Sequence, residues 1–249
     1  MVRMFILDAA SELAIDVMTV RTEAALLDLL GAAAARLGCD YFALSHHVDF
    51  LVAPRQGIRL HNYPEGWARR FDEQRLGPVD PIHRASQRTS AAFLWQEAPR
   101  WTPVRPGDDM VLAEARRHGL HDGLTIPSHL PGEAHGSISF AWRRGRPTLF
   151  DLPFAGMFGP FAFEAARQIA GPVPEANRPR LTDRQRDIVI WAARGKSDWA
   201  IGQILELRPG TVVEHLRNAR GRYDAPNRTA LAIRALWDGT ISFADIARR

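Results

Sequence analysis

Apolar residues along this chain follow two different spacings, which predict two kinds of element. Helical spacing is clearest in residues 22–37, where Gly38 ends the run. Further helices are predicted at residues 64–74, 81–88, 108–118 and 150–169. Runs rich in aromatic and branched residues predict strands at residues 41–51, 124–129 and 136–142. This order favours an α+β domain, an α-β-α sandwich in which helices cover an antiparallel sheet and can enclose a small ligand.

Residues 181–249 show another pattern, in which short amphipathic helices follow one another without strands. We predict an all-α domain of four helices with a helix–turn–helix at its centre. Its scaffold helix spans residues 198–205 and its second helix residues 209–222. Pro209 suits the first turn of the second helix, because the missing N–H has no helical partner there. Four apolar residues form a stripe that should pack inward: Val212, Leu216, Ala219 and Tyr223.

The opposite face of the second helix carries groups that can recognise DNA. A helix of this kind fits the major groove, where Arg can bond guanine bidentately and Asn can bond adenine. Arg217 is predicted to read a base, whereas Lys196, before the scaffold helix, is placed to hold a phosphate. The predicted DNA contacts are Lys196, Ser197, Thr211, Val213, Glu214, Arg217, Asn218 and Arg220. The alternative is a helical hairpin for protein contacts whose charges form a solvated face.

The charge distribution supports the DNA prediction. From Glu175 to the end there are 14 Arg or Lys and 9 Asp or Glu, whereas the preceding residues hold 18 and 19. The basic excess therefore lies in the helical domain, where it can neutralise phosphates. Three prolines within residues 171–179 block regular structure, so we predict domains at residues 1–170 and 181–249 with a linker at residues 171–180.

The chain carries few signals for other compartments. Cys39 is the only cysteine, so no disulfide can form within the chain. The first 17 residues contain Asp8, Glu12 and Asp16 and lack the apolar core of a secretion signal. Acidic residues and prolines interrupt the apolar stretch at residues 150–170, so no membrane span is predicted. We expect a cytoplasmic protein.

Two sets of residues match known families. The first set is Leu181-Thr182, Arg184, Gly195-Lys196-Ser197, Ile201, Ile204-Leu205, Thr211-Val212, His215, Asn218-Ala219, Asn227-Arg228 and Gly239. This set resembles the LuxR-type helix–turn–helix. The second set is Asn62 to Trp67, Phe71, Val79-Asp80-Pro81, Trp95 and Gly123. It resembles the autoinducer-binding domain of LuxR-type quorum-sensing regulators, so the resemblance covers most of the chain.

The resemblance implies a pocket for an acyl-homoserine lactone, lined by Tyr63, Trp67, Phe71, Asp80, Trp95 and Ser139. The ligand offers one amide N–H, an amide carbonyl and a lactone carbonyl. Trp67 can donate to the lactone carbonyl, Asp80 can accept from the amide N–H, and Tyr63 can donate to the amide carbonyl. Trp95 offers an aromatic face to the lactone ring, and Ser139 a further donor. Phe71 in place of a pocket Tyr, and Ile82 where some members carry Thr, predict a less polar pocket.

The resemblance also implies partners: double-stranded DNA with inverted half-sites, a second copy of the chain, and RNA polymerase. No metal, cofactor or catalytic residue is predicted. A possible dimer face lies within residues 150–169, where the apolar positions are Phe154, Met157, Phe161, Ala165 and Ile169.

Three rival functions remain to be weighed. An enzyme would need a catalytic or metal motif, and neighbouring His46 and His47 in a strand point to opposite faces. A phosphate-receiving response regulator would need a lysine before Lys196, and there is none. A regulator that senses a non-lactone metabolite, or an aryl or branched acyl lactone, stays open, with Phe71 as its support.

Overall fold

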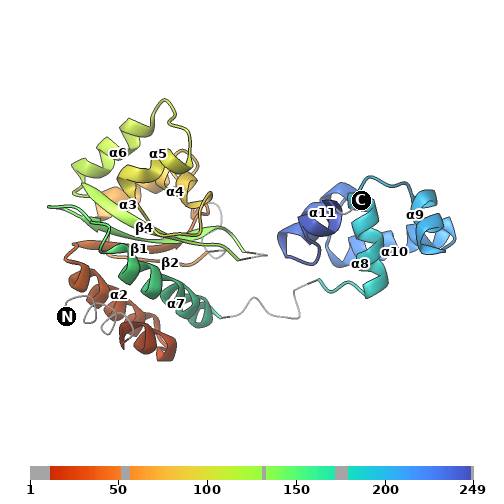
Figure 1. Cartoon of the computed structure of the whole chain (residues 1–249), viewed down its shortest axis with the longest axis horizontal. Helices are drawn as coiled ribbons and strands as arrows, with labels where there is room; N and C mark the ends of the chain where they lie inside the picture. The colour runs from red at the N-terminus through yellow and green to blue at the C-terminus, as the bar shows by residue number, and fades with distance from the viewer. Residues whose placement is uncertain (1–11, 52–56, 131–132, 172–178, 248–249) are drawn as a thin grey trace. The chain divides into compact units, whose positions relative to one another are not determined.

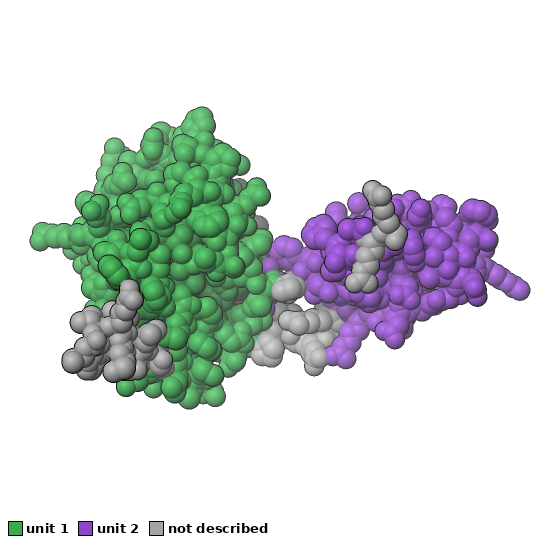
Figure 2. Space-filling model, viewed as in Figure 1, with its two compact units in different colours: residues 1–130, 134–172 green, residues 131–133, 173–249 purple. Residues whose placement is uncertain are grey.

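The computed structural model describes residues 12–51, 57–130, 133–171 and 179–247. The chain divides into two compact units, one formed mainly by residues 1–130 and 134–172 and the other mainly by residues 173–249 (Figure 2). Two of the predictions fall largely outside the described residues. These are the linker, of which residues 172–178 are not described, and the start of the chain up to residue 11.

The first unit is built on a five-stranded antiparallel sheet with the strand order β2-β1-β5-β4-β3. The strands are β1 (Tyr41–His46), β2 (Arg59–His61), β3 (Phe93–Leu94), β4 (Asp122–Ser128) and β5 (Gly136–Trp142). β1 pairs with β5 along its whole length, from Tyr41 opposite Ala141 to His46 opposite Gly136. β1 therefore ends where its partner begins, and the predicted strand at residues 41–51 was too long. β2 and β3 are too short to produce a pattern in the sequence.

Helices cover both faces of this sheet (Figure 1). α2 (Glu23–Leu37) and α7 (Leu152–Ala170) pack on one face against alternate strand residues such as Phe42 and Ile138. The other face is covered by α3 (Glu65–Glu73), α4 (Pro81–Ser86), the 3-10 turn η1 (Trp95–Glu97), α5 (Ala98–Trp101) and α6 (Asp108–Arg117). The α-β-α sandwich predicted from the sequence is confirmed. Residues 12–19 form a further helical segment before α2.

α7 corrects the predicted dimer face. Phe154 and Ala165 are buried in the core that α7 shares with α2 and the sheet, so their side chains cannot contact a partner. Phe161 is exposed on the same helix. The apolar spacing was read correctly as helical, but most of it serves the domain's own core. None of the helices in the described part of the chain combines the length and the hydropathy that a membrane span requires.

The second unit is all helical. Its helices are α8 (Asp183–Ala193), α9 (Asp198–Leu205), α10 (Pro209–Arg222), α11 (Arg228–Trp237) and α12 (Phe243–Ala247). The fifth, short helix α12 was not predicted. Thr182 begins α8 with a capping box, in which its hydroxyl accepts from the Gln185 N–H and the Gln185 side chain accepts from the Thr182 N–H. The predicted inward stripe of α10 is buried, as expected.

The turn between α9 and α10 depends on a glycine. Glu206 ends α9 in the left-handed region with a φ of 55°, and the Leu207 N–H then donates to the Gly202 carbonyl at 2.8 Å. A Cβ on Gly202 would lie 2.7 Å from the Leu207 carbonyl oxygen. That backbone contact is too short for any side chain, so Gly202 permits the tight approach of α9 to the turn.

We expect Gly202→Ala to lower the free energy of unfolding of the helical unit by about 1–3 kcal/mol, because the turn must open to admit the methyl group. Gly221→Ala, in α10, is the matched control, since a Cβ there has nothing within 4 Å. Urea unfolding of both variants provides the measurement. Equal stability of the two variants would show that the turn relaxes without cost.

Candidate functional site

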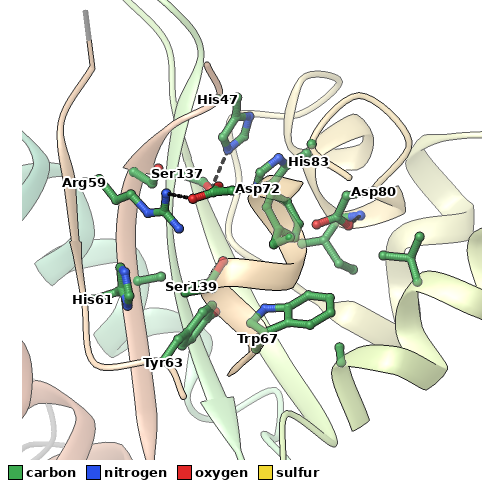
Figure 3. A pocket seen from close by; sticks show the side chains of 18 of the residues that line it. His47, Arg59, His61, Tyr63, Trp67, Asp72, Asp80, His83, Ser137 and Ser139 are labelled. Atoms are coloured by element: carbon green, nitrogen blue, oxygen red, sulfur yellow. Dashed lines mark hydrogen bonds and ion pairs between the residues drawn. The ribbon is translucent and has the colours of Figure 1, made fainter. Parts of the chain in front are cut away.

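A cavity of about 610 Å³ lies between the sheet and the helices α3, α4 and α6. Its volume is in the range of sites that enclose a small organic molecule. All six residues predicted to contact the ligand line its wall: Tyr63, Trp67, Phe71, Asp80, Trp95 and Ser139. Figure 3 shows Tyr63, Trp67 and Ser139 on one side of this space and His47 and His83 on the other.

A chain of hydrogen bonds holds Trp95 against the sheet. The Trp95 indole N–H donates to the Thr125 hydroxyl at 2.9 Å, and the Thr125 and Ser139 hydroxyls are 2.8 Å apart. A Cβ on Gly123 would lie 2.4 Å from Cε2 of the Trp95 ring, so only glycine leaves room for the ring there. The indole N–H is thereby occupied, and the aromatic face is what Trp95 can offer to a ligand. Thr125 was not among the predicted residues, although it lies on the same face of the sheet as Ser139.

Asp80 has two positions at once, at the start of α4 and on the cavity wall. Its Oδ1 accepts from the Ile82 N–H at 2.7 Å, and Pro81 occupies the first helical turn. The side chain is therefore a true helix cap. A carboxylate has about four acceptor sites, so the cap bond leaves capacity to accept from a ligand N–H.

Tyr63 and Trp67 provide hydrogen-bond donors in the same cavity as this carboxylate. Burial, and next the negative charge of Asp80, raise the pKa of the Tyr63 phenol above its usual range, so it stays a neutral donor. Trp67 is buried on α3, with its ring edge-on to Phe71 at 5.5 Å between centroids. Tyr63, Trp67 and Asp80 thus give the cavity two donors and an anionic acceptor beside its aromatic walls.

The opposite side of the cavity is more polar than the sequence predicted. His47 stacks on His83 with ring centroids 3.8 Å apart, and the His47 Nε2 lies 2.9 Å from the Ser137 hydroxyl. Arg59 and Asp72 form an ion pair at 2.6 Å on the same side. Phe71 and Ile82 line the cavity as apolar residues, and these additional polar residues were not predicted because they come from strands and helices far apart in the sequence.

The two neighbouring histidines separate as the strand geometry predicts. The His46 ring packs against Phe163 of α7, with 5.2 Å between centroids, whereas the His47 ring stacks on His83 across the sheet; both residues border the cavity. The two-residue alternation along the strand could have placed His47 in the cavity. His47 continues the alternation of Ala43 and Ser45, which also line the cavity.

A second candidate site is the outer face of α10 with the loop before α9. Arg217 is 74% exposed and lies 3.9 Å from Glu214, and Val213 and Asn218 are also exposed. Thr211 is half-buried at the start of the helix. Arg208, before Pro209, makes no side-chain cap bond.

The loop before α9 presents Lys196 to solvent while its backbone is fixed. Arg228 donates to the Lys196 carbonyl at 2.7 Å, and the Ser197 hydroxyl caps α9 by accepting from the Ala200 N–H at 3.2 Å. Arg220 differs from its prediction. Its guanidinium donates to the Ala225 carbonyl at 3.2 Å and to the Pro226 carbonyl, so it closes the turn after α10 instead of pointing outward.

Comparison with known families covers both units. The model described as the autoinducer binding domain matches residues 22–166. The model described as bacterial regulatory proteins, luxR family, matches residues 179–235. The chain belongs to the LuxR family of transcriptional regulators.

Relatives of this LuxR-family chain are similar over most of their length. It is 32% identical over 184 residues to the transcriptional activator protein BjaR1 of Bradyrhizobium diazoefficiens, covering 72% of this chain and 75% of that protein. It is 30% identical over 213 residues to the quorum-sensing regulator RhlR of Pseudomonas aeruginosa, covering 83% and 85%.

Solved structures show the same fold. The crystal structure of SdiA from Escherichia coli matches with a TM-score of 0.69 at 22% identity, covering 94% of this chain and 98% of that one. SdiA in complex with octanoyl-rac-glycerol matches with a TM-score of 0.70 at 24% identity, covering 95% and 96%. The chain therefore shares the fold of SdiA.

Burial keeps the cavity histidines of this LuxR-family regulator neutral. Burial, and next the nearby His83, lower the pKa of His47 well below its ordinary value of 6.5. Burial also lowers the pKa of His83, although the Asp80 carboxylate opposes that shift. The folded state therefore favours uncharged imidazoles, and the unfolded chain binds more protons in mildly acidic solution.

We expect the free energy of unfolding to be highest above about pH 6.5 and to fall below it, by up to about 1.4 kcal/mol per pH unit for each such histidine. The double variant His47→Asn with His83→Asn should show a shallower fall. His121→Asn, at an exposed histidine, is the control. Urea unfolding at several pH values between about 5 and 8 measures the slopes, and an undiminished slope in the double variant would contradict this assignment.

Proposed function

We propose that this LuxR-family regulator binds an acyl-homoserine lactone in the cavity of its first unit and controls transcription as a homodimer on an inverted-repeat DNA site. One observation carries the ligand part of the proposal. The groups that match a lactone amide converge on a single cavity: Tyr63, Trp67, Asp80, Trp95 and Ser139.

Each polar atom of the ligand then has a partner. Asp80 accepts from the amide N–H, Tyr63 and Ser139 face the amide carbonyl, and the Trp67 indole donates to the lactone carbonyl. Trp95, held by Thr125, packs its face on the lactone ring. A buried carboxylate such as Asp80 is costly without partners, so the bound ligand stabilises the folded state by mass action.

The DNA part of the proposal rests on α10 and on the loop before α9. Arg217 and Val213 face the groove, and Lys196 and Ser197 meet the phosphate backbone, whereas Arg220 has no part in it. The dimer part of the proposal follows from the size of the DNA site. A single recognition helix reads only a few base pairs, so two copies on inverted half-sites give the required specificity. Ile233 and Trp237, one turn apart on α11, are 61% and 52% exposed and support a contact between copies. Contact with RNA polymerase stays a prediction from the family.

We expect Asp80→Asn to weaken lactone binding by roughly ten- to a hundredfold, because a hydrogen bond to a charged group contributes about 1.5–3 kcal/mol. Asn caps a helix as well as Asp does, so α4 should stay folded. Asp28→Asn, on the exposed face of α2, is the charge-matched control. Equilibrium dialysis with a series of lactones measures the dissociation constants. Unchanged binding in both Asp80→Asn and Trp67→Phe would refute the assignment of the polar anchors.

We expect Arg217→Ala and Lys196→Ala to weaken DNA binding in different ways. The first should lose about 1–3 kcal/mol on the cognate site and relax preference at one base position. The second should weaken all sequences alike and make the logarithmic salt slope shallower by about 1. Arg117→Ala is a matched control, since Arg117 is 75% exposed and also pairs with a glutamate three residues before it.

Fluorescence anisotropy with cognate and scrambled duplexes at several salt concentrations separates the two effects. Equal losses on both duplexes for Arg217→Ala would place the reading face elsewhere. Native mass spectrometry of the complex should find two chains on each duplex. One chain on a duplex would contradict the dimer.

A further inference from the structure

The side of the cavity opposite Tyr63 and Trp67 is built unlike a site for a plain hydrocarbon. It is formed by His47, His83, Ser137, Arg59 and Asp72, which we call the histidine end (Figure 3). Every one of these five residues can form hydrogen bonds through its side chain. The proposed lactone contacts leave all five unused, so the tail of the ligand is what would meet them.

The sheet register shows how a tail reaches this end. Ser139 and Ala43 are partners in the sheet, and two residues further along, Ser137 and Ser45 are partners. Both pairs line the cavity. Two residues along a strand advance roughly 7 Å. An extended acyl chain whose carbonyl lies at Ser139 therefore runs along β5 and arrives beside the Ser137 hydroxyl and the His47 ring.

Hydrogen-bonding capacity at this end is left unused. The His47 Nδ1 is buried and has no hydrogen-bond partner among the described residues, and the same holds for the His61 Nδ1 on the neighbouring strand β2. A methyl group against the His47 ring would leave that nitrogen without a partner. A group that can both donate and accept would satisfy it in either tautomer.

The charges at this end indicate a neutral group. Arg59 is already paired with Asp72 at 2.6 Å, so its charge is balanced within the protein. Burial lowers the pKa of His47 and of His83, which keeps both rings uncharged. The described residues give a carboxylate tail no unpaired cation at the histidine end. In the described part of the chain, no group of three His, Cys, Asp or Glu side chains is arranged to hold a metal ion.

We propose that the cavity selects an acyl-homoserine lactone whose tail ends in a neutral hydroxyl group, which hydrogen-bonds with His47 and Ser137. This inference rests on the proposed lactone binding and adds the chemistry of the tail. The hydroxyl donates to or accepts from the His47 Nδ1, and the stacked rings of His47 and His83 cover the last carbons of the chain.

The test uses the full-length protein and matched pairs of ligands. Butanoyl-, hexanoyl- and octanoyl-homoserine lactone are each compared with the derivative that carries a hydroxyl on the terminal carbon, and with the derivative that carries a terminal carboxylate. Equilibrium dialysis measures each dissociation constant. The yield of soluble protein after expression with each lactone is a second measurement that does not require ligand-free protein.

At the length that fits, we expect the hydroxylated lactone to bind roughly three- to tenfold more tightly than its alkyl partner, as one added hydrogen bond gives. His47→Phe keeps an aromatic ring on His83 but removes both nitrogens, so the alkyl lactone should then bind at least as well. Ser137→Ala should reduce the preference with a smaller change of the cavity. His121→Phe, at an exposed position outside the cavity, should keep the wild-type preference.

The outcomes separate the two proposals. If alkyl or carboxylate lactones bind as tightly as the hydroxylated ones at every length, while Asp80→Asn still weakens binding, the tail inference is overturned and lactone binding stands. A hydroxyl preference that survives in both His47→Phe and Ser137→Ala also overturns it. If no lactone binds the wild-type protein by either measurement, the proposed function and the tail inference are overturned together.

Discussion

The pairing of β1 with β5 is the constraint on which the first unit and its cavity depend. Its register, Leu44 opposite Ile138 and Ser45 opposite Ser137, fixes the face on which every side chain of both strands lies. Leu44 and Ile138 pack under α2 and α7, whereas Ser45 and Ser137 line the cavity. A slip of one residue would exchange these sets, placing apolar side chains in the cavity and hydroxyls in the core. Core packing and cavity chemistry are thus two results of one register.

The sequence predicted the parts of this structure that rest on local pattern. Helical spacing located α2 and α7, glycine placed the end of α2, and the outward and inward faces of α10 followed from its stripe around Val212. The resemblance to a family placed Trp67 and Asp80, which periodicity alone would have left as a core residue and a helix cap. Asp80 is in fact such a cap and also lines the cavity, whereas its contact with a ligand stays a prediction.

What the sequence missed depends on contacts between distant segments. The histidine end brings together the segment after β1 with β2, α3, α4 and β5, and no local pattern links His47 to His83 or Arg59 to Asp72. Arg220 was assigned to DNA because helical geometry alone leaves it outward, yet the carbonyls of Ala225 and Pro226 attract its guanidinium inward. In the same way, apolar spacing on α7 could not distinguish a domain core from a dimer face, and Phe154 belongs to the core.

The double position of Asp80 has a consequence for anyone who wishes to redesign this cavity. The carboxylate that faces the cavity also starts α4 through the Ile82 N–H, so most replacements would damage the scaffold together with the recognition chemistry. The side chains of Ala43, Ser45 and Ser137 cap no helix, and the backbone hydrogen bonds of the sheet hold these residues whatever their side chains. New ligand selectivity is therefore most safely engineered at these three sheet positions, with Asp80 left unchanged.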